Sequence, residues 1–183
     1  GIVPRREMKI ETANGINEVT VYSFNGKVNS ASVNLGKAEL AGENIPCIWK
    51  EDKIVNKPAT IGGKEYKVTL VNLGNPHCVV FSEKVDAVDV ETVGPLFENC
   101  EYFPERINAE FIRVVNRVTI KMRVWERGNG ETWSCGTGAA AAVVAAVLNG
   151  YCDRDTNITV KLRGGDLVVN YHSDGEVELI ENV

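Results

Sequence analysis

The run from Ala139 to Ala146 consists only of alanine and valine, and it is the feature that most constrains the fold of this chain. A run rich in alanine favours a helix, and the Asn149-Gly150 pair after Leu148 is a typical helix C-terminal signal. We therefore predict one helix that begins around Cys135 to Gly138, contains Ala139 to Ala146 and ends at Leu148. Its surface is small and apolar, so other elements must bury it.

Most of the remaining sequence indicates β-strands. Asn-Gly pairs at 14–15 and 25–26 are hairpin signals between alternating segments. Strands are predicted at 8–12, 16–22, 65–71, 78–81, 114–124, 158–162, 167–171 and 177–180. A short helix is expected over 85–97, with an interruption at Gly94-Pro95. One long helix among many strands indicates an α+β fold in which a curved sheet buries the helix.

The composition excludes several classes of function. The chain has 183 residues, of which 44% are hydrophobic, enough for a substantial core in one or two domains. Its net charge of −5 provides no basic surface for nucleic acid or for an anionic membrane. The longest apolar run is too short to span a bilayer, and no targeting segment opens the sequence. A cytoplasmic location is the resulting expectation.

The five cysteines form neither a zinc pattern nor a Cys-x-x-Cys pair, and their number is odd. Reduced thiols are therefore expected. No metal cluster and no dinucleotide-binding fingerprint occurs, so we expect neither a metal nor a cofactor. Cys47, Cys78 and Cys152 are predicted to pack in cores, and Cys100, near a helix end, receives no role. Cys135 alone has a physical argument for reactivity.

Cys135 precedes the predicted helix in the segment Cys-Gly-Thr-Gly. The first N–H groups of a helix have no partners within the helix and carry the positive end of its dipole. They can stabilise a thiolate and hold a carboxylate beside it. Gly136 and Gly138 lack a Cβ, which would allow a ligand to approach the main chain. This arrangement suits a sulfur base acting on an acid.

A lone cysteine is more often a buried packing residue than a catalytic one. Here the preceding segment 124–132 provides a strand end with Glu126 and Arg127 and a glycine-rich turn. A strand end, a polar turn and a helix start together form a pocket rim. The context therefore favours a functional role for Cys135, and the planar guanidinium of Arg127 is suited to a carboxylate.

Three motifs occur in order along the chain. They are Gly74-Asn75-Pro76-His77-Cys78-Val79, then Asn108-Ala109-Glu110-Phe111, then Trp125-Glu126-Arg127-Gly128 leading into Glu131-Thr132 and Cys135-Gly136-Thr137-Gly138. On these motifs the sequence closely resembles the cofactor-independent diaminopimelate epimerases. The similarity extends through most of the chain.

The resemblance implies a fold of two similar domains in the complete protein. Each would be a barrel-like, mostly antiparallel sheet wrapped around a central helix, with the active site in the cleft between the domains. Residues 1–35 would be the end of the N-terminal domain, and residues 36–183 would be the C-terminal domain carrying Cys135.

The resemblance also implies the roles of the site residues. Cys135 would be one of two cysteines that face each other across the substrate α-carbon, and Gly136 and Thr137 would donate N–H groups to the carboxylate there. The distal amino acid end of the substrate would be bound by Asn75, Asn108, Glu126 and Arg127. His77 and Glu126 would tune the cysteines. On its own, His77 would be interpreted as a strand-end residue bonded to backbone.

The sequence departs from the family in one respect, the second catalytic cysteine. None of Cys47, Cys78, Cys100 or Cys152 lies in the family's upstream Asn-Gly-x-Arg-Cys context. We therefore expect a fragment that lacks most of the N-terminal domain and that does not epimerise alone. The expected reaction of the complete enzyme interconverts LL- and meso-diaminopimelate, on the route to lysine and peptidoglycan precursors. The expected partner is this small molecule, and a homodimer is compatible with it.

Three alternatives remain open from the sequence. A related racemase acting on proline or another amino acid would share Cys135 but would have less need for the distal residues Asn75, Asn108, Glu126 and Arg127. An isomerase of the phenazine pathway type would dispense with the cysteine. A non-catalytic binding module would bind its ligand equally well after alkylation of Cys135.

Overall fold

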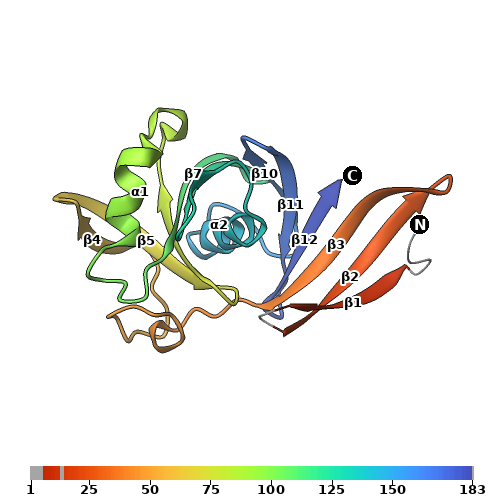
Figure 1. Ribbon diagram of the computed structural model, residues 1–183, viewed down its shortest axis with the longest axis horizontal. Helices are drawn as coiled ribbons and strands as arrows, with labels where there is room; N and C mark the ends of the chain where they lie inside the picture. Colours follow the sequence, from red (N-terminus) through yellow and green to blue (C-terminus); the bar gives the residue numbers. More distant parts are fainter. Residues whose placement is uncertain (1–5, 13–14, 183) are drawn as a thin grey trace.

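The chain folds into one mixed sheet with two α-helices, which confirms the α+β prediction (Figure 1). The computed structural model describes residues 6–12 and 15–182. The strands are β1 (Glu7–Thr12), β2 (Gly15–Phe24), β3 (Lys27–Lys37), β4 (Lys57–Ile61), β5 (Lys64–Asn72), β6 (Pro76–Phe81), β7 (Asn108–Asn116), β8 (Thr119–Glu126), β9 (Gly130–Thr132), β10 (Asn157–Leu162), β11 (Gly165–Tyr171) and β12 (Glu176–Asn182). The helices are α1 (Val90–Glu98) and α2 (Gly136–Leu148), with single 3-10 turns at Gly42–Asn44 and Val85–Ala87.

The strand order is β1-β2-β3-β12-β11-β10-β8-β7-β6-β5-β4, with β9 paired to β8. Neighbouring strands are antiparallel except for two parallel pairs, β10 with β8 and β6 with β7. The sheet is not closed by a ladder among the described residues. A single bridge from Glu39 to Asn72 links the segment after β3 to the end of β5. The sheet is thus mostly antiparallel and curved around a helix, as predicted, but it remains an open barrel.

Helix α2 occupies the centre of this curved sheet and has the predicted bounds (Figure 1). Residues 138–146 are all buried, and the helix packs against strands from both halves of the sheet, including β5, β7 and β11. Side chains no larger than valine let the strands approach the helix axis closely on every side, because interiors are packed without voids. The alanine run therefore determines how tightly the sheet curves.

A second core lies under α1, on the other face of β5–β7. Phe97 of α1 packs edge-to-face against Tyr66 and Phe111. The predicted interruption at Gly94-Pro95 is wrong, since α1 continues through Pro95 to Glu98. The predicted start of this helix is also wrong, because Val85–Ala87 is a separate 3-10 turn.

The physical reason for the continuous helix is packing against Trp125. A Cβ at Gly94 would lie 2.4 Å from the Trp125 ring, so the absence of a side chain lets α1 rest directly on the indole. Proline removes one backbone hydrogen bond. The close contact holds the helix despite that loss.

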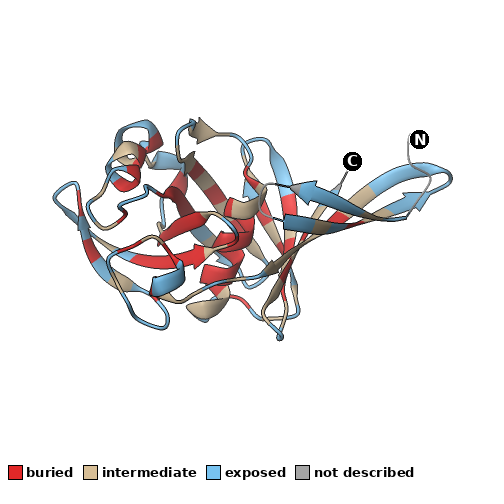
Figure 2. Cartoon of the chain, turned by 60° about the horizontal axis from the view of Figure 1, so that its bottom comes forward, coloured by how far each residue is buried: buried red, intermediate tan, exposed pale blue. Residues whose placement is uncertain are grey.

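Strands β1–β3 form an arm that extends from the barrel and is largely exposed (Figure 2). The arm continues the barrel sheet, because β3 pairs with β2 on one side and with β12 on the other. The predicted turn at Asn25-Gly26 is confirmed, with φ of 51° and 76°. The other signal falls partly on Asn14, outside the described residues, but β1 and β2 pair antiparallel as expected. The predicted domain boundary after residue 35 lies within β3 and stays a prediction.

The apolar stretch 114–124 is divided between two strands. β7 ends at Asn116 and β8 begins at Thr119, so that the chain reverses at Arg117-Val118. The Asn116 side chain accepts a hydrogen bond from the Val118 N–H at 2.9 Å, which closes this turn. No helix among the described residues is long and apolar enough to cross a membrane.

Candidate active site at the start of helix α2

Segments that are distant in the sequence meet at the start of α2. β6 runs parallel to β7, so His77 lies beside Asn108. β8 runs antiparallel to β7, so the C-terminal end of β8 lies beside the start of β7. A hydrogen bond from Asn75 Nδ2 to Thr137 Oγ1, 3.2 Å long, joins the turn before β6 to α2. The sheet register therefore gathers all three sequence motifs at one edge of the barrel.

Cys135 is the N-cap of α2. Its Sγ accepts a hydrogen bond from the Gly138 N–H at 3.3 Å, and the Thr137 hydroxyl lies 3.7 Å away. Burial raises the pKa of the Cys135 thiol to about 11, and an ionised carboxylate at Glu110 or Glu126 would act in the same direction. The Gly138 N–H and Thr137 hydroxyl lower that pKa but do not outweigh burial. The predicted helix-start donor is present, yet the side chain is a thiol at neutral pH.

The two glycines of this turn are needed for packing within the protein. A Cβ at Gly138 would lie 3.0 Å from Glu110 Oε1 and 3.1 Å from Cys135 Sγ. A Cβ at Gly136 would lie 2.8 Å from the Leu179 side chain. Their space is taken by neighbouring side chains, whereas the sequence interpretation reserved it for a ligand.

A chain of polar contacts leads from the barrel interior to Cys135. His77 Nδ1 lies 2.7 Å from Glu110 Oε1, and His77 Nε2 lies 3.0 Å from Asn75 Oδ1. Asn75 in turn donates to Thr137, whose hydroxyl neighbours Cys135 Sγ. His77 and Glu110 are completely buried. Four of the predicted site residues, Asn75, His77, Cys135 and Thr137, thus form one connected group.

Glu110 is not among the site residues predicted from the sequence. Its signal was present, because a glutamate stands between Ala109 and Phe111 in a stretch of otherwise buried, apolar strand residues. Charged residues are almost never fully buried unless they are paired. The partner, His77, is on a different strand 33 positions away, so the pair becomes visible only through the sheet register.

Asn108 and Arg127 are also brought together, but through backbone contacts. Asn108 Nδ2 donates to the Pro76 carbonyl at 2.9 Å, and its Oδ1 accepts from the Arg127 N–H at 2.8 Å. Arg127 Nη1 donates to the Glu105 carbonyl at 2.9 Å. Asn108 therefore fixes both turns of the site in this structure, and its amide atoms are engaged within the protein.

Glu126 is half-buried at the end of β8 and accepts a short hydrogen bond from the Thr132 hydroxyl. Burial is the main cause of the raised pKa of Cys135, and the charge of Glu126 raises this pKa further. Glu126 is thus close enough to influence the thiol, while Arg127 next to it turns toward Glu105.

Glu98 supports the turn that carries Glu126 and Arg127. Its carboxylate accepts hydrogen bonds from Trp125 Nε1 at 2.6 Å, from the Gly128 N–H at 2.9 Å and from Arg106 Nη1 at 2.9 Å. These donors lie on both sides of the two site residues. The end of α1 therefore clamps the turn, a connection that the sequence analysis did not identify.

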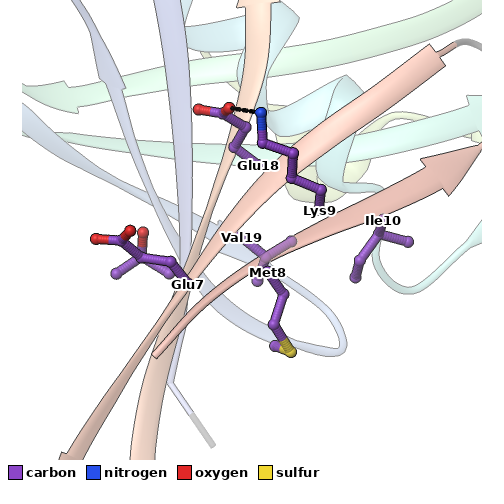
Figure 3. Close-up of a pocket in the computed structure, with 7 residues that line it drawn as sticks. Glu7, Met8, Lys9, Ile10, Glu18 and Val19 are labelled. Atoms are coloured by element: carbon purple, nitrogen blue, oxygen red, sulfur yellow. Dashed lines mark ion pairs between the residues drawn. The ribbon is translucent and has the colours of Figure 1, made fainter. Parts of the chain in front are cut away.

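A hollow on the surface lies away from these residues. Figure 3 shows it on the arm, about 1060 Å³ in volume and lined by β1 and β2 residues that include Met8, Ile10 and Val19. None of the predicted site residues lines it. Among the described residues, no group of three or more His, Cys, Asp or Glu side chains could hold a metal ion.

Comparison with known proteins agrees with this geometry. The sequence pattern of the family "Diaminopimelate epimerase" matches residues 69–182, which include every residue of the site. The chain belongs to this family. It is 44% identical over 174 residues to a diaminopimelate epimerase of Acetivibrio thermocellus, covering 95% of this chain and 61% of that relative. A diaminopimelate epimerase of Bacillus licheniformis is 44% identical over 177 residues, covering 96% of this chain and 62% of the relative.

This family member therefore spans less than two thirds of the length of its relatives. Among solved structures, a probable proline racemase from Agrobacterium radiobacter superposes with a TM-score of 0.68 at 11% identity, covering 98% of this chain and 58% of the other. Such low identity establishes a shared fold and nothing further about the reaction.

Proposed function

We propose that the complete protein interconverts LL- and meso-diaminopimelate by two-base proton transfer at the α-carbon, with Cys135 as one of the two bases. The observation that carries this proposal is Cys135 at the N-cap of α2, hydrogen-bonded by Gly138 and connected to His77 through Thr137 and Asn75. This connected group lies within the part of the chain that matches the family.

The reaction needs one cysteine as a thiolate, to accept a proton, and the other as a thiol, to donate one. One cysteine removes the α-proton as the C–H electron pair moves to the α-carbon, and the other delivers a proton from the opposite face. The carbanion-like transition state needs electrostatic stabilisation in a dry site. Burial raises the pKa of Cys135 to about 11, so Cys135 would be the protonated member of the pair before substrate binds.

The second cysteine must come from outside the described residues. Cys152 follows the far end of α2, and a helix of 13 residues separates it from Cys135 by about 20 Å. Cys78 is next to His77 on β6 and so points to the opposite face of the strand, into the second core. Cys47 belongs to that second core as well, and Cys100 packs against it.

The substrate would bind through both of its amino acid ends. The first N–H groups of a helix have no partners within it, so those of Gly136 and Thr137 would receive the carboxylate at the reacting carbon. Glu126 and Arg127 would bind the distal end, for which the half-buried Arg127 would have to release the Glu105 carbonyl. Asn75, in the turn before β6, would also contact the distal end of the substrate. Asn108 would hold the Arg127 backbone in place.

The arm β1–β3 would be the end of an N-terminal domain, with the active site between the two domains. This assignment of the arm to an N-terminal domain is supported by the apolar face of the arm, where Met8, Ile10 and Val19 line the hollow of Figure 3. An apolar sheet face needs a covering element. The length missing relative to the family would provide that element together with the second cysteine.

The test is hydrogen exchange at the α-carbon in D2O, measured by mass spectrometry on the complete protein. Diaminopimelate should exchange and change configuration, and Cys135→Ser should abolish both while the circular dichroism spectrum is kept, because a hydroxyl is a far weaker base. Full turnover by Cys135→Ser would refute the proposal.

The shared fold with the probable proline racemase makes an amino acid racemase the second candidate. Exchange on L-proline without exchange on diaminopimelate would favour it. A ligand whose affinity is unaffected by alkylation of Cys135, with no exchange on either compound, would indicate a binding module.

A further inference from the structure

Glu110 is a carboxyl group with an incomplete set of partners. The residue is 0% exposed, Oε1 contacts His77 Nδ1 at 2.7 Å, and Oε2 has no hydrogen-bond partner in the structure. An ionised carboxylate accepts hydrogen bonds at both oxygens, and burial of an unpaired charge is costly. A neutral carboxylic acid leaves only a carbonyl oxygen without a partner, which costs much less.

The direction of the neighbouring hydrogen bonds fixes one proton on His77. Asn75 donates through Nδ2 to Thr137, so its Oδ1 faces His77 Nε2 and Nε2 must carry hydrogen. In a neutral imidazole with Nε2–H, Nδ1 is an acceptor. The 2.7 Å contact between Nδ1 and Glu110 then requires a donor on the glutamate.

We propose that Glu110 is a neutral carboxylic acid that donates its proton to His77 Nδ1, and that it is the positioning residue which sets the direction of the hydrogen bonds ending at Cys135. His77 then donates to Asn75, and Asn75 donates to Thr137. The Thr137 hydroxyl, having accepted this bond, keeps its own hydrogen for Cys135 Sγ, 3.7 Å away. This role rests on the proposed function, in which Cys135 is the reacting thiol.

The surroundings of Glu110 agree with a neutral acid. Burial raises its pKa, and the charge of Glu126 on β8 adds to that effect, while His77 on β6 lowers it. The other titratable groups that interact with it are the Cys78 thiol on β6 and the Cys135 thiol at the start of α2. Two thiols and a carboxylate offer Glu110 no cation to stabilise its ionised form.

The first test is the tautomer of His77, read from the ¹⁵N chemical shifts of its ring nitrogens in the 183-residue chain. The sequence contains two histidines. His172→Gln, in the loop between β11 and β12, leaves only the His77 signals. At neutral pH we expect a neutral ring protonated at Nε2 and unprotonated at Nδ1. A ring protonated at both nitrogens, or at Nδ1 alone, would overturn the proposal.

A matched pair of variants tests the glutamate itself. An amide can donate to Nδ1 as an acid does, so Glu110→Gln should keep the His77 tautomer and an alkylation rate of Cys135 within about threefold of the unchanged chain. If Glu110 were a carboxylate paired with an imidazolium, the same change would shift both His77 nitrogens to the neutral range. That shift would contradict the proposal.

Infrared difference spectra give an independent measurement. The C=O band of a protonated carboxylic acid should disappear in Glu110→Gln and persist in Glu98→Gln, because Glu98 receives three N–H donors suited to a carboxylate. No loss of an acid band in Glu110→Gln would refute the neutral acid. These readouts need no substrate, so they stand or fall separately from the epimerase activity, which the exchange assay with Cys135→Ser tests.

Discussion

The thiol of Cys135 is subject to two opposing influences, each traceable to single residues. Burial and the nearby carboxylate of Glu126 favour the neutral thiol, while the Gly138 N–H and the Thr137 hydroxyl favour the thiolate. Burial wins in this chain. The reactivity of the sulfur is therefore expected to respond to small changes in its two hydrogen-bond donors.

Alkylation of Cys135 should follow the formation of the thiolate and rise as pH increases toward about 11. Thr137→Val removes one donor, so the pKa of Cys135 should rise further. A hydrogen bond contributes about 0.5–1.5 kcal/mol, which predicts a roughly twofold to tenfold slower reaction at a fixed pH below the midpoint. The measurement is iodoacetamide labelling followed by peptide mass spectrometry. Thr159→Val on the distant β10 is the control and should react at the original rate.

Glu110 makes a pH-dependent contribution to stability. Burial raises its pKa above the ordinary 4.5, so the folded chain retains a proton that the unfolded chain loses. Stability from this group is full below pH 4.5 and is lost as pH rises through the folded pKa, at about 1.4 kcal/mol for each pH unit between the unfolded and folded pKa values. Glu110→Gln should therefore gain stability relative to the unchanged chain between pH 5 and pH 8 in urea titrations. A constant difference across that range would contradict a raised pKa.

At the scale of elements, α2 and α1 perform different tasks. α2 is a narrow rod of small residues around which the sheet curves, and it presents Cys135 at its first turn. α1 lies outside the barrel and holds the turn after β8 through Glu98 and the contact between Gly94 and Trp125. One helix therefore supplies the sulfur of the proposed base, and the other fixes the turn that carries Glu126 and Arg127.

Enlarging a residue of α2 should strain the barrel. Ala142 is 0% exposed in the middle of the helix, so Ala142→Phe should destabilise the chain by about 1–3 kcal/mol or more. Val118→Phe, in the turn between β7 and β8 where Val118 is 47% exposed, is the matched control and should change stability little. Chemical denaturation measures both. An unchanged midpoint for Ala142→Phe would mean that the strands do not enclose this face.

Removing the charge of Glu98 should loosen the turn after β8. A glutamine cannot accept from Trp125, Gly128 and Arg106 together, so at least one of these part-buried hydrogen bonds is lost, at a cost of about 0.5–1.5 kcal/mol. Faster hydrogen exchange of the Gly128 amide in Glu98→Gln would report this directly. Glu101→Gln, an exposed change just beyond α1, should leave that amide protected. Equal protection in both variants would show that Glu98 does not hold the turn.

At the scale of the whole molecule, the sheet joins two regions of different character. The barrel is buried around α2, while the arm β1–β3 is largely exposed (Figure 2). Large apolar side chains of the arm are exposed, such as Ile16 at 66% and Phe24 at 72%. Isolated apolar residues at a surface are common, but a cluster on one element indicates a covering partner. The arm is thus the part of this chain whose apolar side chains most need a covering element.

The chain alone should not invert diaminopimelate, because the proposed two-face mechanism needs a second thiol and only Cys135, among the cysteines that the structure describes, lies at the start of α2. The purified 183-residue chain, incubated with LL-diaminopimelate in D2O, should show neither deuterium uptake nor the meso isomer. The complete protein under the same conditions is the positive control. Turnover by the short chain would remove the requirement for a cysteine from outside it.

Local patterns predicted most of the elements, and pairing between distant segments accounts for most of what they missed. The bounds of α2 and the turn at Asn25-Gly26 follow from short-range signals, and the structure confirms both. The parallel pairs β6–β7 and β8–β10 have no such signal, because their register depends on the whole sheet. Continuity of α1 through Pro95 depends on Trp125, 30 positions later, and the prediction of a break there is wrong.

The candidate site shows the same division. Asn75, His77, Thr137 and Cys135 were predicted from motifs, and the structure brings them into contact. Glu110 was missed, although a charged residue within an apolar strand indicates a buried group with a specific partner. The clamp by Glu98 could not be predicted, since its three donors come from three separate places in the sequence.

The two edge strands of the open sheet, β4 and β1, differ in how readily they could pair with a further strand. At β4 the margin carries Pro58, which has no N–H to offer an incoming strand, and such residues block edge-to-edge association. β1 contains no proline, and its outer side pairs with no strand among the described residues. Growth of the sheet, whether by added sequence or by a second copy at high concentration, is therefore directed to the β1 margin.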